Sequence, residues 1–240
     1  MTRAPDLPEL GAVVLTAGYN VMLNRHLPQA THLPANLAAS GVLLVLAHRS
    51  GVGIGDLGLG PEAVATGIRT GVIVAAGATA VVAACAAFPV TRRFFVDEKV
   101  RAHSTAELTY HTLLRIPLAT ALGEELVFRA ALLGLFGRGR SRNVAVAMSS
   151  VLFGLWHVLP TLESLGPAPV PTAHDGTGPL RRQRVGRTGI VAGVVVATAA
   201  AGAAFATMRL RSRSVFTPAV VHTTLNVAAM LAARAVSRPA

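Results

Sequence analysis

Two adjacent carboxylates and an arginine lie in the middle of an apolar stretch, at residues 116–136. A charged residue at the centre of a membrane helix costs about 2.5–3.5 kcal/mol on insertion scales, so Glu124, Glu125 and Arg129 each require a partner or a function. Glu125 and Arg129 are four residues apart and are predicted to form an ion pair on one helix face. Glu124 lies about 100° around the helix and has no obvious local partner. An isolated carboxylate of this kind is a candidate for proton exchange.

Two further apolar stretches carry polar residues at the same spacing of four. Phe153 and His157 lie in residues 143–160, and His222 and Asn226 lie in residues 215–235. A single histidine in a membrane helix is as often a structural hydrogen-bond partner as a functional group. Two histidines, an asparagine and an isolated Glu124 on three helices are harder to explain by structure alone, so we predict a shared site.

The sequence lacks the residue patterns that other classes of protease use. No aspartate lies in a confident apolar stretch to complete a serine triad, and Cys85 has no nearby histidine in its own stretch, which argues against covalent catalysis. The HExxH pattern of soluble zinc proteases is also missing from the sequence.

The elements that must position these residues are membrane helices. Among 240 residues 52% are hydrophobic and only 14% are charged. A soluble domain carries about 25% charged residues, so we expect an all-α, polytopic transmembrane helix bundle. About seven spans are predicted, with six to eight possible, at residues 10–24, 34–47, 64–88, 116–136, 143–160, 189–208 and 215–235.

The net charge of +11 comes from cations that cluster between these apolar stretches. Such clusters are typical of loops that face anionic lipid head groups, so the lipid bilayer is the predicted partner. Nucleic-acid binding is not expected, because it requires one basic face with exposed aromatic residues, and aromatics make up only 5% of the chain.

The chain is predicted to form a single integral membrane domain over residues 1–240, with a catalytic core at 116–235. Residues 91–115 are expected to be an amphipathic lead-in near the membrane interface, followed by a new apolar run at 116–136 with Pro117 as its second residue. Residues 161–187 are rich in proline, glycine and arginine and are predicted to form one long hydrophilic loop.

Three patterns together resemble the CAAX-protease and bacteriocin-processing (CPBP or Abi) intramembrane metalloproteases. The patterns are Glu124-Glu125-x-x-x-Arg129, Phe153-x-x-x-His157 and His222-x-x-x-Asn226. Each is weak alone, but their order on separate apolar stretches over about 100 residues is specific. The DLGL stretch at 56–59 is also similar to bacterial members, so the resemblance implies a multi-pass protein of a bacterial plasma membrane.

The resemblance implies an intramembrane endopeptidase that cuts a peptide or a small membrane protein. By this resemblance Glu124 activates water, and His157, His222 and Asn226 hold the water, stabilise the oxyanion or bind a metal. Glu125 and Arg129 would support Glu124, with Phe153 beside them. His157 and His222 with a carboxylate suit Zn²⁺ with an open position, but a glutamate base with His and Asn donors also suffices without metal.

Two other functions use the same residues. A non-catalytic immunity or scaffold protein would use the polar cluster for helix association. A proton-coupled transporter would use Glu and His as a relay, although the sequence lacks the repeated halves typical of transporters.

Overall fold

The structure, a computed structural model, describes residues 4–166 and 179–237, with the side chains of 179–185 excepted. The described residues form helices and connecting turns, without strands. The longer helices are α1 (Leu7–Arg25), α2 (His32–Arg49), α3 (Ala63–Ala87), α9 (Arg142–Trp156), α11 (Pro179–Ser212) and α12 (Phe216–Val236). Short helices connect them: η1 (Gln29–Thr31), α4 (Pro89–Arg92), η2 (Arg93–Phe95), α5 (Glu98–Ala102) and α10 (Val158–Ser164).

One further helix runs without a break over residues 105–137. It comprises α6 (Thr105–Tyr110), η3 (His111–Leu122), α7 (Gly123–Glu125), η4 (Leu126–Leu132) and α8 (Leu133–Gly137), where η3 and η4 have π-helical hydrogen bonding. The apolar run at 116–136 is therefore continuous with the preceding amphipathic segment, and Pro117 lies inside the helix. The wide π-helical turns accommodate the missing N–H of Pro117 inside η3.

The architecture is the predicted all-α polytopic bundle. Five helical segments in the described residues are long and apolar enough to cross a membrane: 29–49, 63–87, 142–164, 186–212 and 216–236. The two other predicted spans are also helical, as α1 and as the helix over 105–137. They are more polar, and the second carries the three charged residues of the first motif.

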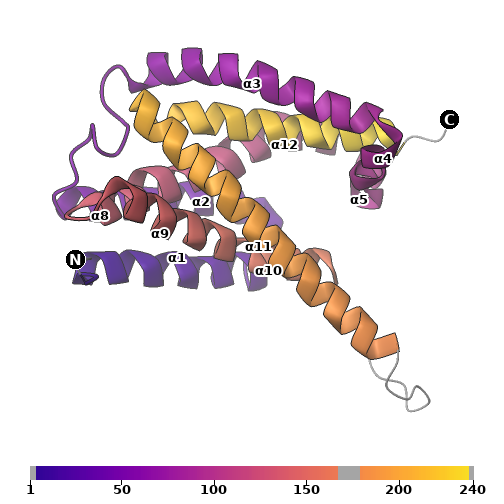
Figure 1. The fold of residues 1–240 in the computed structure, drawn as a ribbon, viewed down its shortest axis with the longest axis horizontal. Helices are drawn as coiled ribbons and strands as arrows, with labels where there is room; N and C mark the ends of the chain where they lie inside the picture. The colour runs from indigo at the N-terminus through magenta and orange to yellow at the C-terminus, as the bar shows by residue number, and fades with distance from the viewer. Residues whose placement is uncertain (1–3, 167–178, 238–240) are drawn as a thin grey trace.

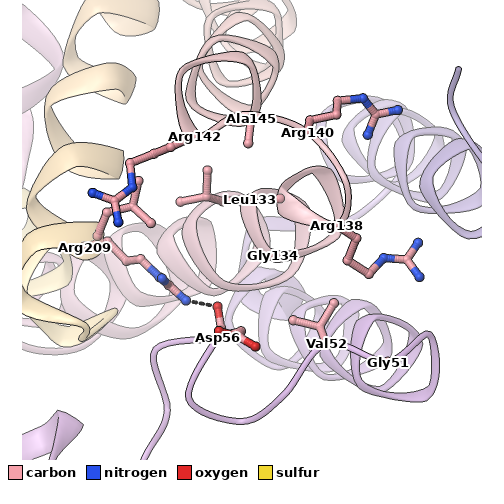
Figure 2. A pocket seen from close by; sticks show the side chains of 12 residues that line it. Gly51, Val52, Asp56, Leu133, Gly134, Arg138, Arg140, Arg142, Ala145 and Arg209 are labelled. Carbon is pink, nitrogen blue, oxygen red and sulfur yellow. Dashed lines mark hydrogen bonds between the residues drawn. The ribbon is translucent and has the colours of Figure 1, made fainter. Parts of the chain in front are cut away.

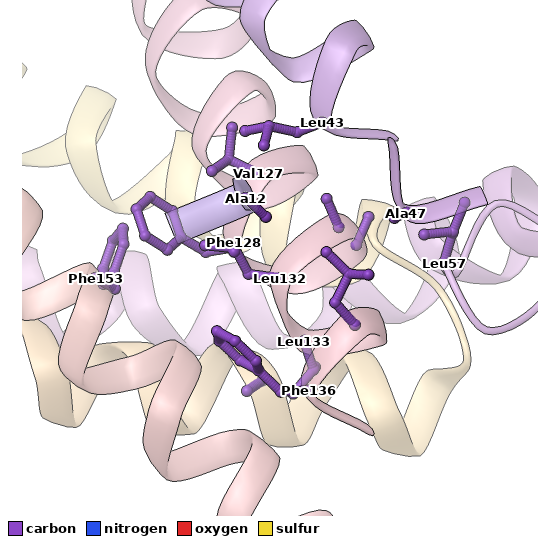
Figure 3. Close-up of a cluster of buried hydrophobic side chains, with 14 of the residues drawn as sticks. Ala12, Leu43, Ala47, Leu57, Val127, Phe128, Leu132, Leu133, Phe136 and Phe153 are labelled. Atoms are coloured by element: carbon purple, nitrogen blue, oxygen red, sulfur yellow. The ribbon is translucent and has the colours of Figure 1, made fainter. Parts of the chain in front are cut away.

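The helix over 105–137 passes through the middle of the bundle. Its residues 127–133 are all buried, and Phe128, Leu132 and Phe136 pack against α1, α2 and α9 in the main hydrophobic cluster (Figure 3). Protein therefore surrounds residues 127–133 in place of lipid, whereas Leu113 and Leu114 in the first half of the helix are exposed. The buried position explains how the bundle tolerates charged residues within it.

Helices α3 and α12 lie side by side along one edge of the bundle (Figure 1). The face of α3 that packs on α12 consists of Ala63, Gly67, Gly71 and Ala75, spaced by four. A Cβ atom at Gly67 would lie 2.2 Å from the hydroxyl oxygen of Ser214. Small residues therefore set the close approach of these two helices, as in other membrane bundles.

Ion pairs fix the start of α1 to the turn between α8 and α9. Asp6 and Glu9 form a capping box at the N-terminus of α1. Asp6 also binds Arg138, and Glu9 binds Arg140 with an O–N distance of 2.6 Å. The hydrogen bonds that Arg140 donates to Glu9 raise the pKa of Arg140 above its ordinary value.

The predicted hydrophilic loop at 161–187 is shorter than expected. Its first residues belong to α10, which ends at Ser164, and α11 already begins at Pro179. Proline favours the first helical turn and arginine is a good helix former, so 179–187 extend the following helix. Arg187 donates hydrogen bonds to the carbonyl oxygens of Leu165 and Gly166. The rest of the predicted loop, 167–178, lies outside the described residues.

Candidate active site

Glu124 is held at the edge of a cavity by an indole from α9. The Nε1 of Trp156 donates a hydrogen bond to Oε1 of Glu124 at 3.2 Å. The other oxygen, Oε2, is buried and accepts no hydrogen bond from the described residues. Glu124 therefore has a local partner that its own helix does not supply, and keeps one oxygen free.

The neighbouring Glu125 is fully buried and has two partners. Its Oε2 lies 3.2 Å from Nε of Arg129, so the predicted ion pair forms. Its Oε1 lies 3.0 Å from Nδ1 of His222 on α12. A carboxylate accepts, so it favours a hydrogen on Nδ1 and leaves Nε2 of a neutral His222 ring as an acceptor.

Aromatic rings surround the guanidinium of Arg129. The guanidinium carbon lies 3.9 Å from the ring centroid of Phe153, 5.4 Å from that of Phe205 and 5.8 Å from that of Phe128. Gly202 on α11 leaves room for this group, because a Cβ there would lie 3.3 Å from Nη2 of Arg129. Cation–π contacts thus replace hydrogen bonds for a cation that is fully buried.

The free oxygen of Glu124 faces His222. Oε2 of Glu124 and Nε2 of His222 are 4.0 Å apart. This separation is too long for a hydrogen bond, but one water oxygen at about 2.8 Å from both atoms would hydrogen-bond to each. The ring of His222 stacks on Phe205 with a centroid distance of 5.1 Å, which fixes its plane.

The remaining predicted residues lie around this centre without touching Glu124. Nδ1 of His157 is 2.8 Å from the carbonyl oxygen of Phe153. A carbonyl only accepts, so this nitrogen carries the hydrogen and Nε2 is left without a partner among the described residues. The rings of His157 and His222 both meet Phe153 edge-on, at 4.7 Å and 6.2 Å. Asn226 lies one turn beyond His222, partly exposed, and hydrogen-bonds to none of the described residues.

The described residues do not form a metal site. No group of three or more His, Cys, Asp or Glu side chains among them is arranged to hold an ion. A catalytic zinc takes three protein ligands as a rule. The expected pair His157 and His222 therefore lacks a complete donor set, and we derive no step through a metal.

One cavity reaches Glu124, and a separate groove lies on a neighbouring face of α12. The cavity, about 300 Å³, has Glu124 and Trp156 in its wall. Its basic groups are Arg115, Lys99 and His32, and Glu163 is its second carboxylate. The groove, about 640 Å³, is apolar and lies between α3, η3 and α12. The groove begins at Thr223, directly after His222, and is otherwise lined almost entirely by alanine, valine, leucine and threonine.

Sequence reasoning missed two residues of this site. Trp156 is the only tryptophan and directly precedes His157, so its position was a usable signal. Phe205 lies in a stretch of alanines on α11 and belongs to no motif. Only the packing of α11 against α9 and α12 brings it to Arg129 and His222.

One family model matches the chain, over residues 106–228, and is described as type II CAAX prenyl endopeptidase Rce1-like. The match contains all three motifs that converge here. No curated protein and no solved structure matches the chain. The matched segment spans half of the 240 residues, and its apolar helices are those of an integral membrane protein. The chain therefore belongs to the Rce1-like family of CAAX proteases.

Proposed function

We propose that this chain is an intramembrane endopeptidase in which Glu124 activates the attacking water. The main support for this proposal is the 4.0 Å separation between the free oxygen of Glu124 and Nε2 of His222. A water placed there donates one hydrogen to each atom, which aligns its lone pairs for attack. The resemblance and the family both support peptide hydrolysis as the reaction class.

In the proposed reaction Glu124 removes a proton from the water, and the oxygen attacks the scissile carbonyl carbon. Asn226 donates its amide N–H to the oxyanion, a contribution of about 3–4 kcal/mol for donors of this kind. The C–N bond then breaks as Glu124 returns the proton to the leaving amine. His157, with Nε2 free, accepts a hydrogen bond from the substrate near that amine.

Glu125 and Arg129 act through other residues in this proposal. Glu125 fixes the tautomer of His222, and Arg129 balances the charge of Glu125 inside the bundle. Hydrogen bonding of this kind to a catalytic histidine sets which nitrogen can accept. Both are positioning residues, because neither contacts the proposed water.

The cavity and the groove support a lipidated peptide as substrate. The apolar groove between α3, η3 and α12 suits a prenyl chain, the group named in the family description. Arg115 and Lys99 in the Glu124 cavity suit the free carboxylate at the end of a peptide. We propose a substrate that is prenylated and cut close to its C-terminus, in the plasma membrane of a bacterium.

The decisive experiment replaces Glu124 with Gln in the full chain. Turnover of a farnesylated peptide in detergent should fall by at least about 100-fold, because the amide cannot take up the proton. The unfolding temperature should stay near that of the wild type, since Gln still accepts the indole hydrogen bond. Glu62→Gln, at an exposed residue just before α3 that lines neither the Glu124 cavity nor the apolar groove, serves as the control.

Retention of turnover by Glu124→Gln would remove the water-activation role. Retention of the biological function together with a total lack of hydrolysis by the wild type would favour the non-catalytic scaffold instead.

A further inference from the structure

A second cavity, of about 390 Å³, lies at the other end of the bundle from the cavity at Glu124. The Glu124 cavity is lined by Leu23 and Asn24, at the end of α1. The second cavity is lined by Arg138 and Arg140, whose partners Asp6 and Glu9 are at the start of α1. The two cavities therefore lie at opposite ends of α1.

Four arginines line the second cavity, and two of them have no acidic partner on α1 to neutralise their charge. Arg138 and Arg140 point away from the cavity (Figure 2), and each is neutralised by an acidic residue of α1. Arg142 and Arg209 lie on the other side, with Asp56 as the acidic residue in the wall. Two guanidinium groups against one carboxylate leave one positive charge at this site.

Arg209 is the buried member of this pair. The residue is only 6% exposed, and its Nη2 donates to the backbone carbonyl of Asp56, as Figure 2 shows. Its Nε is buried and has no hydrogen-bond partner among the described residues. This Nε lies beside Gly58, where a Cβ would meet it at 3.1 Å, while the guanidinium as a whole lines the cavity. A buried guanidinium that is not fully hydrogen-bonded is costly, and an anion in the cavity would offset part of that cost.

Arg142 is the exposed member and makes no ion pair with any described residue. It is the first residue of α9, placed there by the N-cap Ser141. Apolar side chains complete the wall beneath the two cations, namely Leu133, Ala145 and Leu210. The cavity is thus lined by two cationic side chains on one side and by apolar side chains next to them, at the ends of membrane helices.

We propose that this cavity holds a phosphate group, with an anionic phospholipid as its source. Guanidinium groups bind phosphate oxygens through paired, charge-assisted hydrogen bonds. Basic pockets between membrane helices are established sites for anionic head groups, and the apolar side chains next to the two cations suit the glycerol and upper acyl chain. One net positive charge matches the single negative charge of phosphatidylglycerol. This site is independent of the proposed peptidase site.

The test measures binding of short-chain phosphatidylglycerol to the full-length protein in neutral detergent by titration calorimetry. Arg142→Gln should weaken the affinity about fivefold, because one cation near a lipid surface contributes about 1 kcal/mol. Arg142 is exposed, so the variant should keep the wild-type unfolding temperature. Arg209→Lys keeps the charge but loses the fork and should also bind more weakly.

The matched control is Arg211→Gln, an exposed arginine on α11 that does not line the cavity. It should bind phosphatidylglycerol as the wild type does. Equal affinity for phosphatidylcholine, equal weakening by Arg211→Gln, or unchanged affinity in Arg142→Gln would each overturn the proposal.

Inorganic phosphate distinguishes the two sources. Failure of millimolar phosphate to compete with the lipid supports a lipid site. Binding of inorganic phosphate alone, with the same dependence on Arg142, supports the phosphate site but overturns the lipid as its source.

Discussion

At the scale of single residues, the site depends on two adjacent carboxylates that have different hydrogen-bond partners and different burial. Glu125 is fully buried and shared between Arg129 and His222. Glu124 faces a cavity and accepts one hydrogen bond, from Trp156. Glu125 is thereby held by two partners within the bundle, and in the proposed mechanism the free oxygen of Glu124 takes the proton of the attacking water.

Trp156→Phe tests how Glu124 is positioned. Phenylalanine retains the ring contacts to Tyr19 and Phe128 but removes the hydrogen bond to Oε1. A hydrogen bond to a charged group contributes about 1.5–3 kcal/mol, so kcat should fall about tenfold or more while KM stays unchanged. Steady-state kinetics on one peptide measures both, and an equal rise of KM would indicate a binding role instead.

Removal of metal ions tests whether His157 and His222 act without a bound metal. The described residues do not assemble three ligands, so 1,10-phenanthroline should leave the initial rate within about twofold of the untreated enzyme. His157→Ala and His222→Ala should both lose activity without any change in bound zinc, measured by elemental analysis. Loss of activity that only added zinc restores would contradict this prediction.

At the scale of elements, the π-helical segments η3 and η4 flank the two glutamates on both sides. Such segments are frequent at functional sites because they redirect side chains within a helix. Here α7 points Glu124 toward α9 and Glu125 toward α12. A site formed from three helices therefore needs their separations to be fixed.

Gly67→Ala tests the contact of α3 with α12. The added methyl would lie 2.2 Å from Oγ of Ser214 and 2.6 Å from Cβ of Phe216, so one helix must shift. Overpacking of this kind costs about 1–3 kcal/mol of unfolding free energy. Gly77→Ala in the same helix meets no atom within 4 Å and should be neutral or stabilising. Unfolding in mixed micelles measures both, and equal stabilities would refute this role for Gly67.

At the scale of the whole molecule, the charged helix is enclosed by more apolar ones. The helix over 105–137 contacts α2, α9 and α12, and three of the five membrane-length segments contain these helices. Lipid thus meets apolar side chains, such as the exposed Val72, Ile73 and Val196, while the charges of the first motif stay inside. The proposed hydrolysis within a bilayer depends on this polar interior.

Membrane extraction tests this arrangement. The chain should remain in the membrane pellet after washing at alkaline pH and high salt, because several apolar helices hold it by hydrophobic burial. Detergent should release it. Release by alkaline washing alone would show a peripheral protein. Phosphatidylglycerol content should not alter this result.

The sequence by itself determined the helical membrane bundle, the three motifs and the pair of Glu125 with Arg129. Hydropathy and a spacing of four depend only on local order along the chain, so both can be read without a fold. The tertiary structure decided that Trp156 holds Glu124, that His222 bonds to Glu125, and that Phe205 completes the cage around Arg129. These contacts join residues 32 to 97 positions apart, and only the packing of whole helices brings such residues within a few ångströms.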